Sequence, residues 1–61
     1  MLRIVESTDH HNRGKELQGP IKVGDEITLN DGFIFEVAKI EVEMASIKIS
    51  NDNYQIIVVQ E

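Results

Sequence analysis

The sequence predicts a single all-β domain of five short strands, and three observations lead to this prediction. Apolar and polar residues alternate with a period of two, which places successive side chains on opposite faces of a strand. The apolar residues are largely valine and isoleucine, which favour strands over helices. Turn-forming stretches such as Asp31-Gly32 and Ser50–Asn53 separate the alternating segments. The 61 residues are expected to form one domain, residues 1–61.

The first strand is expected over residues 2–6, where Leu2 and Ile4 alternate with Arg3. The next stretch, residues 7–20, is polar, and Leu17 is the one side chain that can anchor it to a core. So long a loop in so small a domain is usually functional or disordered. We therefore expect residues 7–20 to form a mobile polar loop between the first and second strands.

The second strand is expected over residues 26–30, followed by Asp31 and Gly32. An Asp-Gly pair between alternating segments favours a tight hairpin, since both central residues of a type I′ turn have positive φ. We expect Gly32 to have a left-handed backbone conformation.

The third strand begins at Phe33, and its buried face changes partway along. Apolar residues hold the odd positions up to Val37 and the even positions from Ala38 onward. Because the strand period is two, the buried face must switch near residues 37–38, through a bulge or a strand that passes between two halves of a barrel. A helix over residues 36–45 is the alternative interpretation, since apolar residues also recur there at helical spacing.

The fourth strand is expected over residues 47–50 after a connection at residues 43–46, and the fifth over residues 54–59. Five short strands with one long polar loop between the first two indicate an SH3-like barrel. The segments 23–27, 33–40 and 47–49 resemble the strand pattern of Tudor and related SH3-like domains. A Tudor domain holds a methylated cation among several aromatic rings. The aromatic residues here are Phe33, Phe35 and Tyr54, and we expect both phenylalanines to lie in the core.

The charge distribution argues against a general nucleic-acid-binding role. Residues 1–24 carry four basic and three acidic side chains, whereas residues 25–61 carry two basic and eight acidic ones, for a net charge of −5. Affinity for nucleic acid depends largely on neutralising phosphates, so nucleic acid is a disfavoured partner and a basic protein a better one. The chain has no cysteine and no apolar stretch long enough to span a membrane. We expect a cytoplasmic, non-enzymatic binding module with no cofactor.

The polar loop supplies an alternative function, which is binding of nucleic acid or phosphate. His10, His11, Arg13 and Lys15 offer positive charge, and Gly14 would let a ligand approach the backbone. Asp9-His10-His11 is also the one cluster of metal-ligand side chains, but a metal site needs three or four ligands in fixed geometry. We expect no metal site and no catalytic residues.

Two surfaces are candidates for contact with another protein. Glu41 and Glu43 share one face of the third strand and would suit a basic partner. Val5, Ile57 and Val59 are expected on the outer face of the terminal strands, because Leu2, Ile4 and the other face of the last strand fill the core. Such β-branched residues at an open edge would favour a weak homodimer or the capture of a partner.

Overall fold

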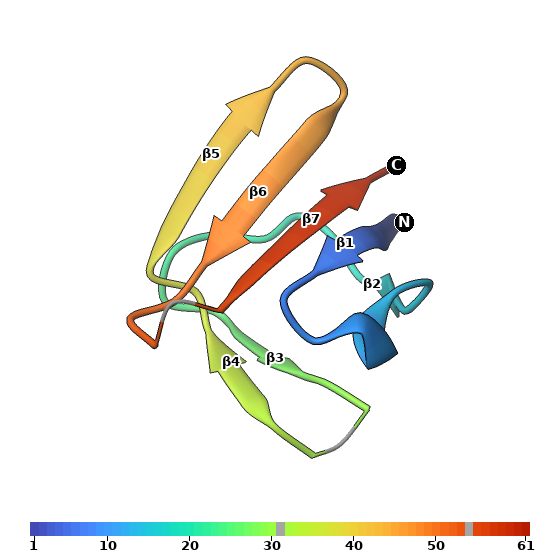
Figure 1. Ribbon diagram of the computed structural model, residues 1–61. Helices are drawn as coiled ribbons and strands as arrows, with labels where there is room; N and C mark the ends of the chain where they lie inside the picture. The colour runs from blue at the N-terminus through green and yellow to red at the C-terminus, as the bar shows by residue number, and fades with distance from the viewer. Residues whose placement is uncertain (31, 54) are drawn as a thin grey trace.

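The computed structural model describes residues 1–30, 32–53 and 55–61, which form seven antiparallel strands and one short 3₁₀ helix (Figure 1). A five-stranded sheet has the order β2-β1-β7-β6-β5, and β3 and β4 form a separate two-stranded sheet. The elements in chain order are β1 (Leu2–Ser7), η1 (His10–Asn12), β2 (Glu16–Leu17), β3 (Glu26–Thr28), β4 (Ile34–Glu36), β5 (Lys39–Glu43), β6 (Ser46–Ser50) and β7 (Ile56–Gln60). The all-β prediction is confirmed, and the helix considered for residues 36–45 is wrong because strands occupy this segment.

The chain passes from the small sheet to the large sheet at residues 37–38. The Val37 N–H donates to the Asp25 carbonyl at 2.9 Å, which continues the β3–β4 ladder. The next residue, Ala38, donates instead to the Ser50 carbonyl at 2.9 Å and so starts the β5–β6 ladder. The predicted switch of the buried face near residues 37–38 is confirmed, since Phe35 and Val37 are buried and Ile40 then turns toward the core.

The expected closed five-stranded barrel is not observed. Within the described residues, the ladders leave β2 and β3 as edges of different sheets. The expected third strand is two strands, β4 and β5, because the partner changes at residues 37–38. Figure 1 shows the β3–β4 hairpin extending away from one end of the large sheet.

The expected loop over residues 7–20 contains regular structure. The Ile4 N–H donates to the Lys15 carbonyl at 2.9 Å and the Gly14 N–H donates to the Ile4 carbonyl at 2.8 Å, so the chain returns along β1. Strand β2 then places Leu17 opposite Leu2, and both side chains are buried. Leu17 is the anchor that the sequence predicts. The mobility of residues 7–20 stays a prediction.

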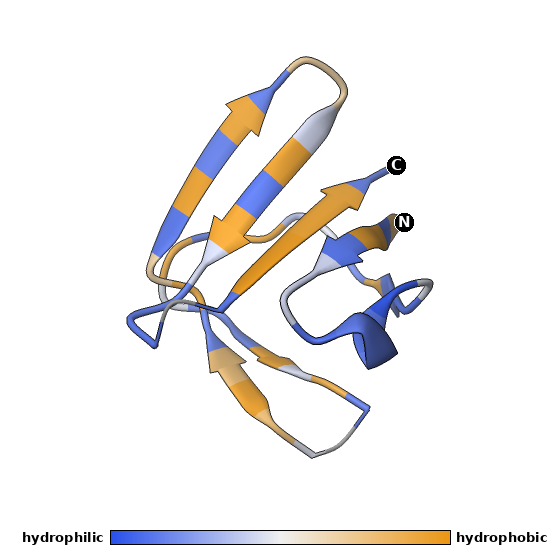
Figure 2. Ribbon diagram, viewed as in Figure 1, coloured by the Kyte–Doolittle hydropathy of each residue, from blue (hydrophilic) through white to orange (hydrophobic). Residues whose placement is uncertain are grey.

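The core lies between the two sheets and is almost entirely aliphatic. Its buried members are Leu2, Ile4, Leu17, Ile27, Leu29, Phe35, Val37, Ile49, Ile57 and Val59, and Phe33 packs against them. Strand β7 is apolar along most of its length, whereas β5 and β6 alternate (Figure 2). The core position expected for Phe35 is confirmed.

The expected outer position of Ile57 and Val59 is wrong, because both side chains are 1% exposed or less. Val59 lies opposite the buried Ile4, so the odd positions of β7 point inward. A register shift between Ile4 and Glu6 then leaves Val5 out of the β1–β7 pairing. The run of apolar residues in β7 shows no alternation that would have revealed its inner face.

Positive φ occurs in the turns that follow β3 and β5, as well as at Gly14 and Gly24. Gly32 has φ +82°, and its N–H donates to the Leu29 carbonyl at 2.9 Å, so its predicted left-handed conformation is confirmed. Asp31, the other half of the predicted turn, lies outside the described residues, as does Tyr54 at the start of the expected fifth strand. The two-residue turn between β5 and β6 holds Met44 at φ +50°.

Candidate functional site

Asp9, in the polar loop, caps the 3₁₀ helix. The Asp9 carboxylate oxygen Oδ1 accepts the His11 backbone N–H at 3.1 Å and lies 3.0 Å from Nδ1 of the His11 ring. The backbone hydrogen bond, and then the contact with the imidazole, lower the pKa of Asp9 below its usual value. His11 is therefore engaged with a neighbour in its own loop.

The remaining loop residues do not converge on one point. Lys15 Nζ donates to Asn30 Oδ1 at 3.2 Å, which ties the loop to the tip of the β3–β4 hairpin. His10 and Arg13 border a shallow hollow over Val5, away from that contact. No group of three His, Asp or Glu side chains in the described ranges could hold a metal ion.

The outer face of the large sheet is mixed in character. Val5, Ile56 and Val58 are partly exposed there, while Ile57 and Val59 are buried and cannot form a contact surface without unfolding. Glu41 and Glu43 share the outer face of β5, as the alternation predicts, since their partners on β6 are Lys48 and Ser46.

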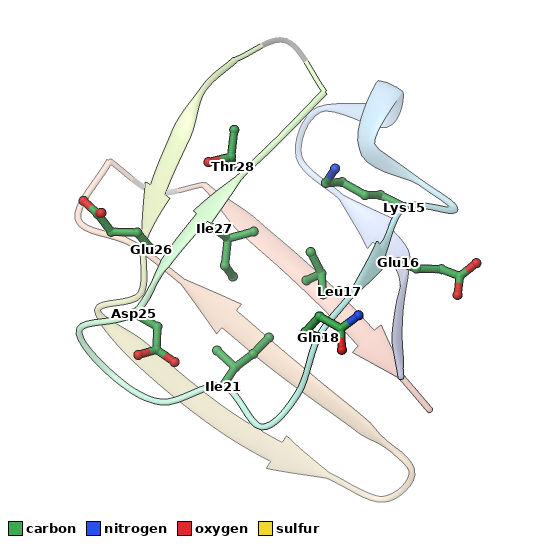
Figure 3. A pocket seen from close by; sticks show the side chains of 9 residues that line it. All are labelled: Lys15, Glu16, Leu17, Gln18, Ile21, Asp25, Glu26, Ile27 and Thr28. Carbon is green, nitrogen blue, oxygen red and sulfur yellow. The ribbon is translucent and has the colours of Figure 1, made fainter.

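One hollow lies between the edges of β2 and β3. Figure 3 shows Leu17, Ile21 and Ile27 pointing toward one another across it, whereas Glu16 and Glu26 point away. The cleft has a volume of about 400 Å³. Its floor consists of Leu17 and Ile27, which are core residues. This cleft therefore marks the gap between the edge strands of the two sheets, which do not pair with each other.

A second hollow, which we call the β5 groove, is larger and more apolar. It has a volume of about 520 Å³ and lies on the inner face of the large sheet between the β5–β6 hairpin and residues 18–21. Gln18, Gly19 and Glu61 contribute to its lining, and its apolar side chains are Met1, Leu2, Pro20, Ile21, Ile40, Val42, Ile47 and Ile49.

The border of the β5 groove exposes large apolar side chains. Val42 is 72% exposed and Met1 is 69% exposed. Beyond the groove, at the tip of the hairpin, Met44 is fully exposed at 102%. The hairpin extends past the core, so the inner face of β5 is covered at Ile40 and open at Val42.

The sequence pattern identified the side chains of this surface but predicted that they would be buried. The alternation of Ile40, Val42 and Met44 predicted an inner face, and an inner face is expected to be buried. Alternation identifies which side chains share a face, but it does not show how far the opposing layer extends. The groove could not be distinguished from core on this pattern alone.

No protein-family model, curated protein or solved structure matches this chain. None of the helical residues that the structure describes form a helix with the length and apolar character needed to cross a membrane.

Proposed function

We propose that this chain is a non-enzymatic protein-binding module that holds its partner in the β5 groove. The observation that carries the proposal is the exposure of Val42 and Met1 beside a hollow lined by aliphatic side chains. Contiguous exposed apolar surface on a small domain is typical of an interaction site. Because a partner would remove this surface from water, its burial would contribute favourably to binding.

The acidic character of the chain supports a protein partner over a nucleic acid. The net charge is −5, and Glu61 lies in the lining of the groove. Binding of phosphate or nucleic acid through His10, Arg13 and Lys15 is the alternative, and the contacts of Lys15 and His11 with their own neighbours weigh against it.

We also propose that the two sheets are an open variant of an SH3-like barrel in a cytoplasmic protein. The passage of the chain between sheets at residues 37–38 supports the first part, because one strand of a small barrel commonly serves both halves. The absence of cysteine supports the second part.

The test compares two exposed valines. Val42 borders the groove, whereas Val23, which is 61% exposed, lies outside the groove lining. A partner isolated with the wild-type chain should be retained by Val23→Lys and lost by Val42→Lys, with both variants showing the wild-type circular dichroism spectrum. Equal retention by the two variants would contradict the proposal. Salt-sensitive binding of RNA or DNA that Arg13→Glu abolishes would favour the alternative.

A further inference from the structure

Strand β5 has the longest free edge among the described strands. It ends the five-stranded sheet and contains five residues, whereas β2 at the opposite edge has two and the strands of the small sheet have three each. A free edge presents unpaired N–H and C=O groups, which makes it a template for a strand from another chain. The five residues of β5 allow several such hydrogen bonds.

The hydrogen bonds between β5 and β6 show which residues of β5 direct their backbone N–H and C=O groups toward the free edge. The Ser50 carbonyl accepts the Ala38 N–H, so Ser50 directs its backbone groups toward β5. In an antiparallel ladder the direction alternates from residue to residue. Ser50 pairs with Lys39, so Lys39, Glu41 and Glu43 direct their backbone groups toward β6, and those of Ile40 and Val42 point away from it.

The same two residues line the groove with their side chains. A strand that paired with the backbone of Ile40 and Val42 would place its inward side chains beside theirs, over the β5 groove. The free edge and the apolar hollow are thus two parts of one surface.

The opposite face of β5 has two carboxylates toward the hairpin tip, with Lys39 and, on β6, Lys48 beside Glu41. Glu41 and Glu43 lie on this face, and Lys39 Nζ is 3.7 Å from Glu41 in an exposed pair. The alternate side chains of an added strand would lie on this face, within reach of both carboxylates. Basic side chains would therefore complement them.

From these observations we infer that the β5 groove binds an extended segment of another protein, added as a strand to β5, in which apolar residues alternate with lysine or arginine. This inference rests on the proposed protein-binding function and specifies the form of the partner. A second copy of the chain is a poorer occupant, since each copy has a net charge of −5 and a symmetric pairing centred on Glu41 would place that carboxylate opposite itself.

The experiment uses the whole chain and a short peptide in which valine and lysine alternate. Strand addition should slow amide hydrogen exchange at Ile40 and Val42 by at least about tenfold at saturation, since these N–H groups become hydrogen-bonded. A peptide of the same composition, with its valines and lysines in two blocks, should not do so.

Charge is tested with two double variants of equal net charge. Replacing Glu41 and Glu43 by glutamine should weaken binding of the alternating peptide by about two- to fivefold, as expected for exposed ion pairs. The matched control replaces Glu26 and Glu36, which face each other in the small sheet, by glutamine. Equal weakening by both variants would show that only the overall charge acts and would overturn the role of Glu41 and Glu43.

The outcomes separate this inference from the proposed function. Chemical-shift changes in the groove without protection of Ile40 and Val42 would overturn strand addition and leave a protein-binding groove. No binding of the alternating peptide would also overturn the inference, while the comparison of Val42→Lys with Val23→Lys still decides the proposed function. Concentration-dependent protection of the same amides without peptide would assign the edge to a second copy.

Discussion

Gly32 and Met44 both have left-handed backbone conformations but very different side chains. Gly32 has φ +82° in the turn after β3, and Met44 has φ +50° in the turn between β5 and β6. A residue with a Cβ is disfavoured in this region by roughly 1–2 kcal/mol, whereas glycine adopts it readily. The two positions should therefore respond to substitution in opposite directions.

Replacing Gly32 by valine should lower the free energy of unfolding by about 1–2 kcal/mol. A Cβ at this position has no atom within 4 Å, so the loss arises from the backbone conformation and not from a clash. Urea denaturation measures the change. Gly32→Asn is the control and should lose less, since asparagine tolerates positive φ. A neutral Gly32→Val would contradict the tight turn.

Replacing Met44 by glycine should raise the free energy of unfolding by about 0.5–1 kcal/mol, because it removes the strain of a side chain at φ +50°. Ala45 is the matched control, since it shares the turn and does not have positive φ. Ala45→Gly should instead destabilise the protein. If both glycine variants lose stability, Met44 is not strained in solution.

The contact of Asp9 with His11 should make part of the stability depend on pH. The pKa of Asp9 is lowered from an ordinary value of 3.8, chiefly by the backbone hydrogen bond from His11. A carboxyl group with a depressed folded-state pKa stabilises the fold fully above pH 3.8 and stops doing so as the pH falls through the folded value. An NMR titration of the Asp9 carboxyl carbon should give a midpoint below 3.8, and a midpoint at or above it would show that the cap is absent.

Strand β7 shows how much a single element depends on the register of its neighbour. Ile57 and Val59 point inward because Val59 lies opposite Ile4, although the apolar side chains of β7 would suit either face. Val58 lies on the outer face, opposite Glu6 and Lys48. The face of β7 is therefore set by pairing and not by its own sequence.

This assignment predicts different outcomes for two adjacent truncations. Ile57→Ala should lower the free energy of unfolding by about 2–5 kcal/mol, because it leaves a cavity in the core. Val58→Ala, on a partly exposed site, should lower it by less than about 1 kcal/mol. Thermal and urea unfolding of the two variants, measured side by side, test the pair. Similar losses would contradict the assignment of Ile57 to the inner face and Val58 to the outer face.

The accuracy of the sequence predictions varied between elements for physical reasons. The change of face at residues 37–38 was predictable because charged residues on each side fix which face is outward. Strand β2 was not, since two residues carry no periodic pattern and its pairing depends on the return of Gly14 and Lys15 along β1. For the β5 groove, the alternation predicted that its β5 side chains share one face. Their exposure was not predictable, because it depends on where the opposing layer ends.

Across the whole molecule, one core connects two sheets that share no ladder among the described residues. Ile27 comes from β3 and Leu29 directly follows this strand, while Ile49, Ile57 and Val59 come from the large sheet, yet all belong to one buried cluster. We expect the two sheets to unfold together, since neither has a core of its own. The proposed binding surface lies outside this cluster, at Val42, so a partner could be bound without disturbing the core.

The pairing of β1 with β7 also affects the order in which the strands pair during folding. Arg3 lies opposite Gln60, so this ladder must close almost the entire chain, whereas a two-residue turn joins β5 to β6. Loop-closure entropy delays distant pairings, so we expect β5, β6 and β7 to associate in the folding transition state and β1 to dock later.

Two conservative truncations of fully buried isoleucines test this order. Ile49→Val, in β6, should mainly slow folding, and Ile4→Val, in β1, should mainly accelerate unfolding. Folding and unfolding rates measured across a range of urea concentrations separate the two effects. If Ile4→Val slows folding as much as Ile49→Val does, the ends of the chain meet before the rate-limiting step. A late-docking β1 would make detachment of this strand the first step of unfolding.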